Sequence, residues 1–191
     1  MDKAAHPWLA TYEHLNRDWQ QVPAIPDCTL SGYVRAHARD LGDREALVYA
    51  GQGITYAQLD QLADQLAHWL RDQGLTRQDV LGIQLPNIPQ LVLAIVAAAR
   101  LGVTVTTIAP LLTAPEVKQQ ARDAGIKALI TLDNLYPESV APVLDELPEL
   151  EQVLVTRATD MPGAAPDTPF EAEAPVPVSD RLSPRGPRRW A

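Results

Sequence analysis

The residues that could carry nucleophilic or metal chemistry are few and lie far apart in this sequence. Its only cysteine is Cys28, so a CxxC metal site is excluded, and no serine stands in a GxSxG elbow. The histidines do not have the spacing of a zinc site such as HExxH: His6, His14, His37 and His68. We interpret His37 and His68 as exposed or packed helix residues rather than as ligands.

Phosphate binding also lacks its usual residues. A phosphate cradle needs glycines that let backbone amides approach the ligand, with a lysine or a helix N-terminus behind them. Only Gly51 and Gly53 lie close together, and neither a GxGxxG motif nor a Walker loop is present. The lysines are scattered: Lys3, Lys118 and Lys127. We therefore predict that this chain has no catalytic, cofactor-binding or metal-binding residue and no cofactor of its own.

The polar residues that follow two predicted strands could bind a ligand or cap a helix. Asn87 and Thr113 follow predicted parallel strands, and open α/β sheets bind ligands at that edge. Helix capping explains both residues, and we favour it over a ligand role. Asp60, Asp64 and Asp72 lie along one predicted helix and are interpreted as a solvated face.

Composition limits the class of protein. A chain of 191 residues with 46% apolar residues can bury one sizeable core. The formal net charge of -8 argues against a nucleic-acid surface, because phosphate binding needs a basic face. The N-terminus MDKAAHPWLATYEHL has no apolar signal region, and no apolar stretch reaches spanning length. We predict a cytoplasmic protein with no nucleic-acid partner and no transmembrane segment.

The sequence is organised around residues 79–125, which read as strand, helix, strand, helix. The apolar run 80–85 ends at Pro86, and Asn87 is expected to cap the next helix, with Gln90 reaching back to the cap. That helix is apolar nearly all round and ends at Gly102, which predicts burial on both sides. Strands joined by single helices should be parallel, with right-handed crossovers.

The other predicted elements extend this pattern on both sides. Before the central stretch we expect a helix at 30–41 between Thr29 and Gly42, a hairpin at 46–55 and a helix opened by a Thr55–Gln58 capping box. Within and after it, we expect a strand at 103–108, a helix opened by a Thr113–Glu116 capping box and stopped by Gly125, a strand at 127–133, a helix at 135–147 weakened by Pro142, and a strand at 152–156. The fold class is α/β, a mainly parallel, doubly wound sheet layer.

These patterns divide the chain into three segments. Residues 1–28 read as an N-terminal arm on the domain surface, and residues 29–157 as the α/β domain. Residues 158–191 are rich in proline and alanine and then basic, with no apolar period, which predicts a disordered tail.

Three stretches, GDREALVYAGQGITYAQLDQLADQLAHWLRDQGL, DVLGIQLPNIPQLVLAIVAAARLGV and APLLTAPEVKQQARDAGIKALIT, together resemble the N-terminal part of adenylate-forming acyl-CoA synthetases. HPWLATY, VPAIPDCTL and LVTRATD are similar to bacterial long-chain fatty acid CoA ligases within that superfamily. The resemblance covers about residues 7–157. It implies the fold of that family's N-terminal subdomain.

The resemblance also implies a reaction. In the family, a carboxylate attacks the α-phosphorus of ATP with Mg²⁺ present, giving an acyl-adenylate and pyrophosphate, and the thiol of CoA then displaces AMP. The family's phosphate loop, adenine and Mg²⁺ motif, ribose-binding aspartate and catalytic lysine have no matching position here, so no catalytic residue is carried over. After SDRL the chain continues SPRGPRRWA, and we expect a chain truncated before the phosphate loop, by a changed reading frame or a split gene.

Three functions follow from these observations. The first is an incomplete acyl-CoA synthetase, inactive alone, which leaves open whether this chain is itself an enzyme. The second is a noncatalytic interaction module or one half of a split synthetase, with the missing remainder or a second copy as its partner through an exposed sheet edge. The third, a stand-alone nucleotide binder, is disfavoured because the glycine motif is missing.

Overall fold

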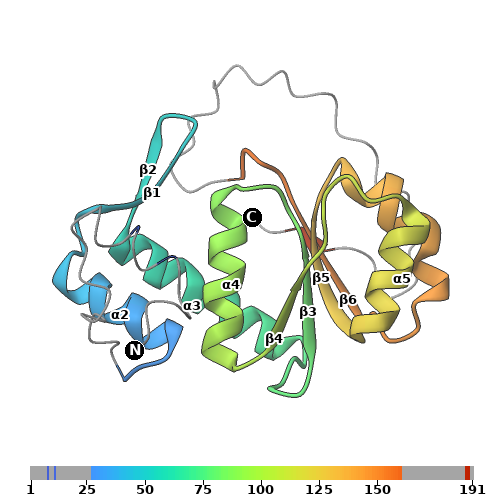
Figure 1. Cartoon of the computed structure of the whole chain (residues 1–191), viewed down its shortest axis with the longest axis horizontal. Helices are drawn as coiled ribbons and strands as arrows, with labels where there is room; N and C mark the ends of the chain where they lie inside the picture. Colours follow the sequence, from blue (N-terminus) through green and yellow to red (C-terminus); the bar gives the residue numbers. More distant parts are fainter. Residues whose placement is uncertain (1–7, 9–10, 12–26, 161–187, 190–191) are drawn as a thin grey trace.

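The computed structural model describes residues 8, 11, 27–160 and 188–189 of the chain. Its centre is a sheet in the order β4-β3-β5-β6-β7, and all neighbouring strands in it run parallel. A two-stranded antiparallel hairpin, β1-β2, stands apart from this sheet (Figure 1). The strand bounds are β1 Glu45–Tyr49, β2 Gln52–Thr55, β3 Val80–Gln84, β4 Thr104–Thr107, β5 Ile126–Leu132, β6 Gln152–Thr156 and β7 Arg188–Arg189.

Helices cover both sides of the sheet, as expected for a doubly wound layer. In Figure 1, α4 lies between the sheet and the pair α2 and α3, and α5 lies on the opposite side. The mainly parallel α/β fold predicted from the sequence is therefore confirmed. The helix bounds are α2 Leu30–Asp40, α3 Tyr56–Asp72, α4 Pro89–Leu101, α5 Ala114–Ala124, the π-helical turn η2 Tyr136–Val140 and the 3₁₀ helix η3 Ala141–Glu146.

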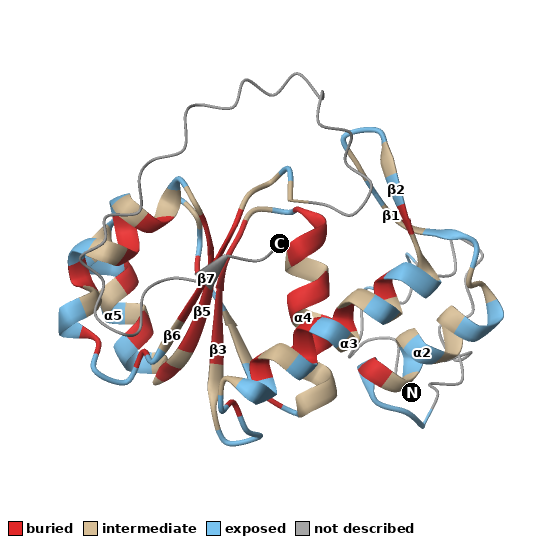
Figure 2. Ribbon diagram, turned by 180° about the vertical axis from the view of Figure 1, so that it is seen from behind, coloured by how far each residue is buried: buried red, intermediate tan, exposed pale blue. Residues whose placement is uncertain are grey.

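Helix α4 is the most apolar helix of the domain, and it belongs to two parts of the core. Ala94, Ala97 and Ala98 pack with the sheet, whereas Leu93 and Val96 pack with the hairpin and α3. The red, buried colouring of most of α4 in Figure 2 reflects this double contact. The prediction of a helix buried on both sides is confirmed. A second group of buried residues lies under α5, η2 and η3 on the other face of the sheet.

Several predicted helix ends are confirmed. Thr55 and Gln58 form the expected capping box, with Thr55 Oγ1 accepting from the Gln58 N–H at 3.2 Å and the Gln58 side chain accepting from the Thr55 N–H at 2.9 Å. Thr29 Oγ1 accepts from the Gly32 N–H at 3.1 Å. Gly102 closes α4 with φ 70°, a left-handed conformation that costs glycine little.

The hairpin predicted at 46–55 has a two-residue turn. Ala50 and Gly51 alone separate β1 from β2, and both have positive φ, 49° and 78°. Two positive φ values are typical of the two-residue turns whose twist matches a hairpin. Ala50 is the only residue other than glycine with positive φ among those described.

Two predicted helix boundaries were wrong, and one predicted helix is divided. Asn87 does not cap α4: Ile88 occupies the N-cap position and makes no side-chain cap bond. Helix α2 ends one residue early, with Leu41 rather than Gly42 closing it. The helix predicted at 135–147 divides into η2 and η3, because Pro142 removes a backbone donor from its interior and the Ala141 N–H reaches the Tyr136 carbonyl.

The predicted arm and tail fall almost wholly outside the described residues, so they stay predictions. Within the described part of the chain, no helix is both long enough and apolar enough to cross a membrane.

Candidate functional site

The carboxyl edge of the parallel sheet is the place where a fold of this kind binds ligands. Four segments reach that edge: the loops after β3 and β4, and the residues that follow β5 and β6. Their polar side chains decide what the edge could do. We describe them in turn, beginning with the buried ones.

A buried polar cluster joins the ends of β3 and β5 to η2. The Gln84 side chain is fully buried, and its amide nitrogen donates to Ser139 Oγ at 3.0 Å. Its amide oxygen accepts from the Thr131 hydroxyl at 2.9 Å, and Ser139 in turn donates to the Leu135 carbonyl. Because each member is paired within the cluster, these hydroxyls are held in place rather than free to act as nucleophiles.

Gln90 makes the second contact at this edge, and sequence reasoning missed it. Its amide nitrogen donates to the Arg157 carbonyl at 2.9 Å and to the Asp160 carbonyl at 3.4 Å, so α4 is tied to the exit of β6. Arg157 Nε donates to Asp133 at 2.8 Å, which links the exits of β5 and β6. The expected reach of Gln90 back to a helix cap was wrong. A glutamine inside an otherwise apolar helix was the signal that could have revealed a buried polar contact.

The two residues considered for ligand binding behave as follows. Asn87 is exposed, next to the N-terminus of α4. Thr113 forms the predicted capping box with Glu116, whose carboxylate accepts from the Thr113 N–H at 2.8 Å and from the Thr113 hydroxyl at 2.6 Å. Hydrogen bonds from the Thr113 hydroxyl and backbone lower the pKa of Glu116. Thr113 is therefore committed to α5.

The described lysines are engaged in ion pairs away from this edge. Lys118 lies 2.9 Å from Glu146, whose pKa it lowers. Lys127 lies 3.2 Å from Asp79 and donates to the Gly74 carbonyl at 3.0 Å. Burial raises the pKa of Asp79, but hydrogen bonds from Thr76 and the Lys127 ammonium outweigh it, so the net shift is downward. Both lysines connect neighbouring elements.

The described histidines do not form a metal site. His37 contacts the Tyr33 carbonyl through Nδ1 at 3.0 Å and packs against the Tyr33 ring, and His68 is exposed. His6 and His14 lie outside the described residues. Among the residues that the structure describes, no three histidine, cysteine, aspartate or glutamate side chains gather as metal ligands.

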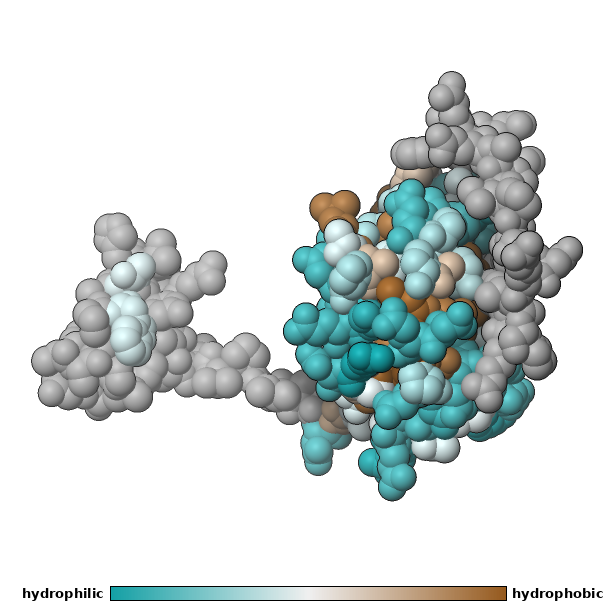
Figure 3. All heavy atoms as spheres, turned by 90° about the vertical axis from the view of Figure 1, so that its right-hand side faces the viewer, coloured by the Kyte–Doolittle hydropathy of each residue, from teal (hydrophilic) through white to brown (hydrophobic). Residues whose placement is uncertain are grey.

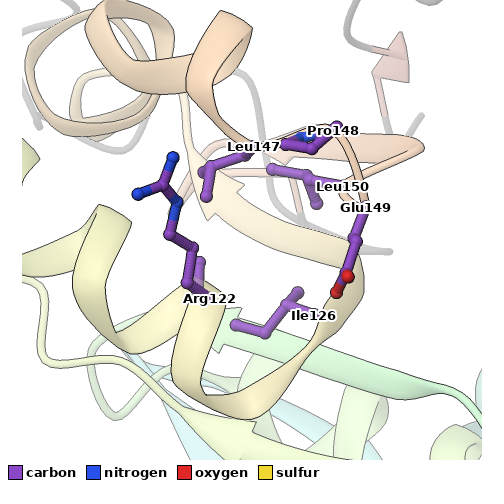
Figure 4. Close-up of a pocket in the computed structure, with 7 residues that line it drawn as sticks. Arg122, Ile126, Leu147, Pro148, Glu149 and Leu150 are labelled. Carbon is purple, nitrogen blue, oxygen red and sulfur yellow. The ribbon is translucent and has the colours of Figure 1, made fainter.

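A shallow cavity of about 270 Å³ lies at the opposite end of the sheet (Figure 4). Its walls come from α5, the first residue of β5 and the loop that leads into β6, so it is at the amino ends of the strands. Arg122 on its rim already donates to the Glu146 carbonyl at 2.9 Å. The face of the molecule on the α5 side is mainly hydrophilic, with some hydrophobic patches (Figure 3). The lining residues are Ala121, Arg122, Ile126, Leu147, Pro148, Glu149 and Leu150.

The aspartates of α3 form the predicted solvated face only in part, because Asp60 and Asp64 also bind a cation of α4. Arg100 of α4, whose side chain is 4% exposed, pairs with both Asp60 and Asp64. Burial raises the pKa of Asp64, but the Arg100 and Arg35 guanidiniums outweigh this and lower it overall. Asp72 is the most exposed of the three aspartates. The prediction was incomplete because the helix itself does not reveal which cation a neighbouring helix places against it.

This arrangement does not fit ATP and Mg²⁺ as it stands. Gln84, Thr131 and Ser139 are paired with one another at the carboxyl edge. The Gln90 nitrogen is bonded to backbone carbonyls, its amide oxygen has no partner among the described residues, and the described lysines are paired elsewhere. What the edge does provide is a fixed position for the segments that leave it, because Gln84, Gln90 and Arg157 tie together the end of β3, η2, the start of α4 and the exits of β5 and β6.

Comparison with known proteins defines the class. The family model described as "AMP-binding enzyme" matches residues 34–188. Since this is more than half of the chain, the protein belongs to the family of AMP-binding enzymes, which confirms the resemblance found in the sequence.

Particular relatives are acid–CoA ligases. The chain is 31% identical over 154 residues to a long-chain-fatty-acid–CoA ligase of Bacillus subtilis, covering 81% of this chain and 27% of the relative. It is 31% identical over 131 residues to an acetyl-coenzyme A synthetase of Streptomyces avermitilis, covering 62% of this chain and 20% of the relative. The chain therefore spans about a quarter of the length of these relatives.

Solved structures agree on the fold. The coronafacic acid ligase of Pectobacterium brasiliense superposes with a TM-score of 0.69 at 17% identity, covering 85% of this chain and 28% of that one. Because the two sequences are only 17% identical, this structural similarity shows the fold alone.

Proposed function

We propose that this chain is the N-terminal α/β layer of a carboxylic acid–CoA ligase, and that the acid is a fatty acid. The observation that carries the proposal is the alignment of 81% of the chain with a long-chain-fatty-acid–CoA ligase. The family's reaction, activation of the acid as an acyl-adenylate followed by transfer to CoA, is the activity in which the layer takes part. Its cellular setting is the cytoplasm, without a nucleic-acid partner.

The proposed role of this chain's residues is to hold the sheet edge on which the active site is built. Gln90, Asp133 and Arg157 fix the exits of β5 and β6, and Gln84 fixes the end of β3. ATP, Mg²⁺ and CoA are then bound with groups that these 191 residues do not provide. The chain alone is therefore proposed to be inactive.

Acid-dependent exchange between ATP and pyrophosphate tests this role. The purified chain should give background exchange with palmitate, decanoate and acetate. Co-expression with the other three quarters of the Bacillus subtilis relative should restore exchange, with palmitate or decanoate preferred over acetate. Exchange by the chain alone would overturn the proposed inactivity, and failure to restore exchange with any of the three acids would overturn the proposed role of the layer.

Two variants test whether restoration of exchange depends on the fold of this chain. Leu93 is 1% exposed and packs between α4 and the hairpin, so Leu93→Asp should abolish restoration by unfolding the layer. Asn87 is exposed, and Asn87→Ala should leave restoration unchanged. Restoration that survives Leu93→Asp would show that the chain does not contribute its fold.

A noncatalytic interaction module, or one half of a split synthetase, is the second candidate. It is favoured by Leu111, which follows β4 and is 95% exposed. An apolar side chain so exposed next to an edge strand is suited to contact a partner. Leu111→Ser should weaken capture of the remaining part of the relative without changing the folding of the chain. Equal capture by both forms would argue against this surface.

A further inference from the structure

Strand β6 would be the edge of the sheet if β7 did not lie beside it. Figure 2 labels β7 next to β5 and β6, and the register pairs Leu154 with Arg188 and Val155 with Arg189, in parallel. The three central residues of β6 are all buried: Val153, Leu154 and Val155. A valine-rich strand with an open edge is a template for pairing with another chain.

The hydrogen-bonding directions along β6 can be assigned from its other neighbour. The Asp133 N–H donates to the Thr156 carbonyl at 3.0 Å, so Thr156 faces β5. Backbone groups alternate in direction along a strand, so Leu154 also faces β5, and Val155 faces β7.

The same alternation distinguishes the two residues of β7. In a parallel pair, one residue of each registered pair points its N–H and C=O at the other strand. Leu154 already faces β5, so its partner Arg188 must face β6. Val155 faces β7, so its partner Arg189 points its backbone groups away.

The opposite edge of the sheet shows a comparable device. The Ile108 N–H donates to the Ile83 carbonyl, so Ile108 faces β3, and Thr107 faces outward by alternation. The outward Thr107 carbonyl accepts from the Gln120 side chain at 2.9 Å. The Gln120 side chain of α5 thus binds a carbonyl group that another strand would need for pairing with β4.

We propose that Arg188–Arg189 is an edge cap that the chain forms on itself, and that it excludes a second copy of the chain from β6. The cap acts through backbone hydrogen bonds of Arg188 rather than through the arginine charges. It does not depend on the ligase role proposed above.

Two proline variants test this cap with matched charge. Arg188→Pro removes a backbone donor directed at β6, whereas Arg189→Pro removes one directed away from it. Each variant loses one arginine, so their net charges are equal. Amide exchange is followed by NMR on the full chain, at a concentration where the chain sediments as a monomer.

The Val155 amide is the reporter, and the Leu154 amide, directed at β5, is the internal control. In this register the Val155 N–H faces the Arg188 carbonyl, which proline keeps, and the Arg188 N–H faces the Val153 carbonyl, so Arg188→Pro weakens the pairing beside Val155 without removing the Val155 acceptor. Val155 should exchange about three- to tenfold faster in Arg188→Pro than in the unsubstituted chain, because opening of the β6–β7 pair becomes easier by the free energy of one backbone hydrogen bond. Arg189→Pro should match the unsubstituted chain, and Leu154 should be the same in all three.

Sedimentation at higher concentration provides the second readout. Arg188→Pro should self-associate more strongly than Arg189→Pro, because only the former opens the β6 edge. The proposal is overturned if Val155 exchanges equally in the unsubstituted chain and Arg188→Pro. It is also overturned if the two proline variants behave alike in either measurement.

Discussion

The buried amide of Gln90 joins the first turn of α4 to the carbonyl of Arg157, 2.9 Å away, just past the end of β6. The two residues are 67 positions apart in the sequence. Gln90 is 1% exposed, and its amide oxygen has no hydrogen-bond partner among the described residues. Together with the Asp133–Arg157 pair, this contact ties the start of α4 to the exits of β5 and β6.

Replacement of Gln90 should show that its nitrogen, not its volume, is what matters. Gln90→Met keeps the shape but leaves the Arg157 and Asp160 carbonyls without this donor, and we expect a loss of about 1–2 kcal/mol in the free energy of unfolding. Gln90→Glu should cost more, because it buries a carboxylate against carbonyl oxygens. Urea denaturation measures both. A Gln90→Met chain as stable as the original would contradict the assignment.

Replacing the two aspartates that pair with Arg100 should destabilise the domain more than replacing Arg100 itself. Removing both Asp60 and Asp64, as leucines, leaves a nearly buried guanidinium without its carboxylates, which we expect to cost about 3–5 kcal/mol. Arg100→Met should cost less, since Asp60 and Asp64 are exposed enough to be hydrated. Denaturation midpoints compare the two variants. Equal losses would mean that the ion pairs do not govern the site.

Gly82 should be a close-packed position of β3. A methyl group there would lie 2.8 Å from Ile126 Cδ1 and 3.0 Å from Leu129 Cδ1. Gly82→Ala should therefore destabilise the domain by about 1–3 kcal/mol, the usual cost of overpacking. In an Ile126→Val background, which removes the nearest atom, the same substitution should cost less. Additive losses in this double-mutant cycle would show that Ile126 is not the obstacle.

The Glu116 capping box predicts a pH dependence with a definite sign. The Thr113 hydroxyl and N–H hold the pKa of Glu116 below its ordinary value of 4.5, so the folded state binds this proton less readily than the unfolded state. The resulting stabilisation is present above pH 4.5 and is lost as the pH falls through the lower, folded pKa. Glu116→Gln should lose this part of the acid dependence, as measured by thermal unfolding at a series of pH values. If Glu116→Gln and the original chain lost thermal stability equally as the pH fell, the prediction would be contradicted.

The sequence predicted local features well because local chemistry determines them. Thr55 with Gln58, Thr113 with Glu116, and Gly102 are read from residues within a few positions of each other. The alternation of strands with single helices likewise predicted the parallel sheet. The disordered tail predicted at residues 158–191 and the arm predicted at residues 1–28 stay predictions.

Long-range polar contacts could not be predicted in the same way. Arg100 meets Asp60 across 40 positions and Gln84 meets Ser139 across 55, and no periodicity encodes which buried polar groups will face each other. The prediction that Asn87 caps α4 was wrong for a related reason. Asparagine is a common cap residue, but Ile88, which precedes Pro89, takes the extended conformation of the N-cap position. The candidate site was therefore less predictable than the fold.

The double burial of α4 has a consequence for how the domain opens. Leu93 and Val96 belong to the group that holds the hairpin and α3, and Ala94, Ala97 and Ala98 to the group that holds the sheet. Alternating membership along one helix means that neither group can come apart while α4 stays fully packed. The hairpin and α3, although outside the sheet, should therefore lose native-state protection together with β3 and β5, as one cooperative unit rather than two.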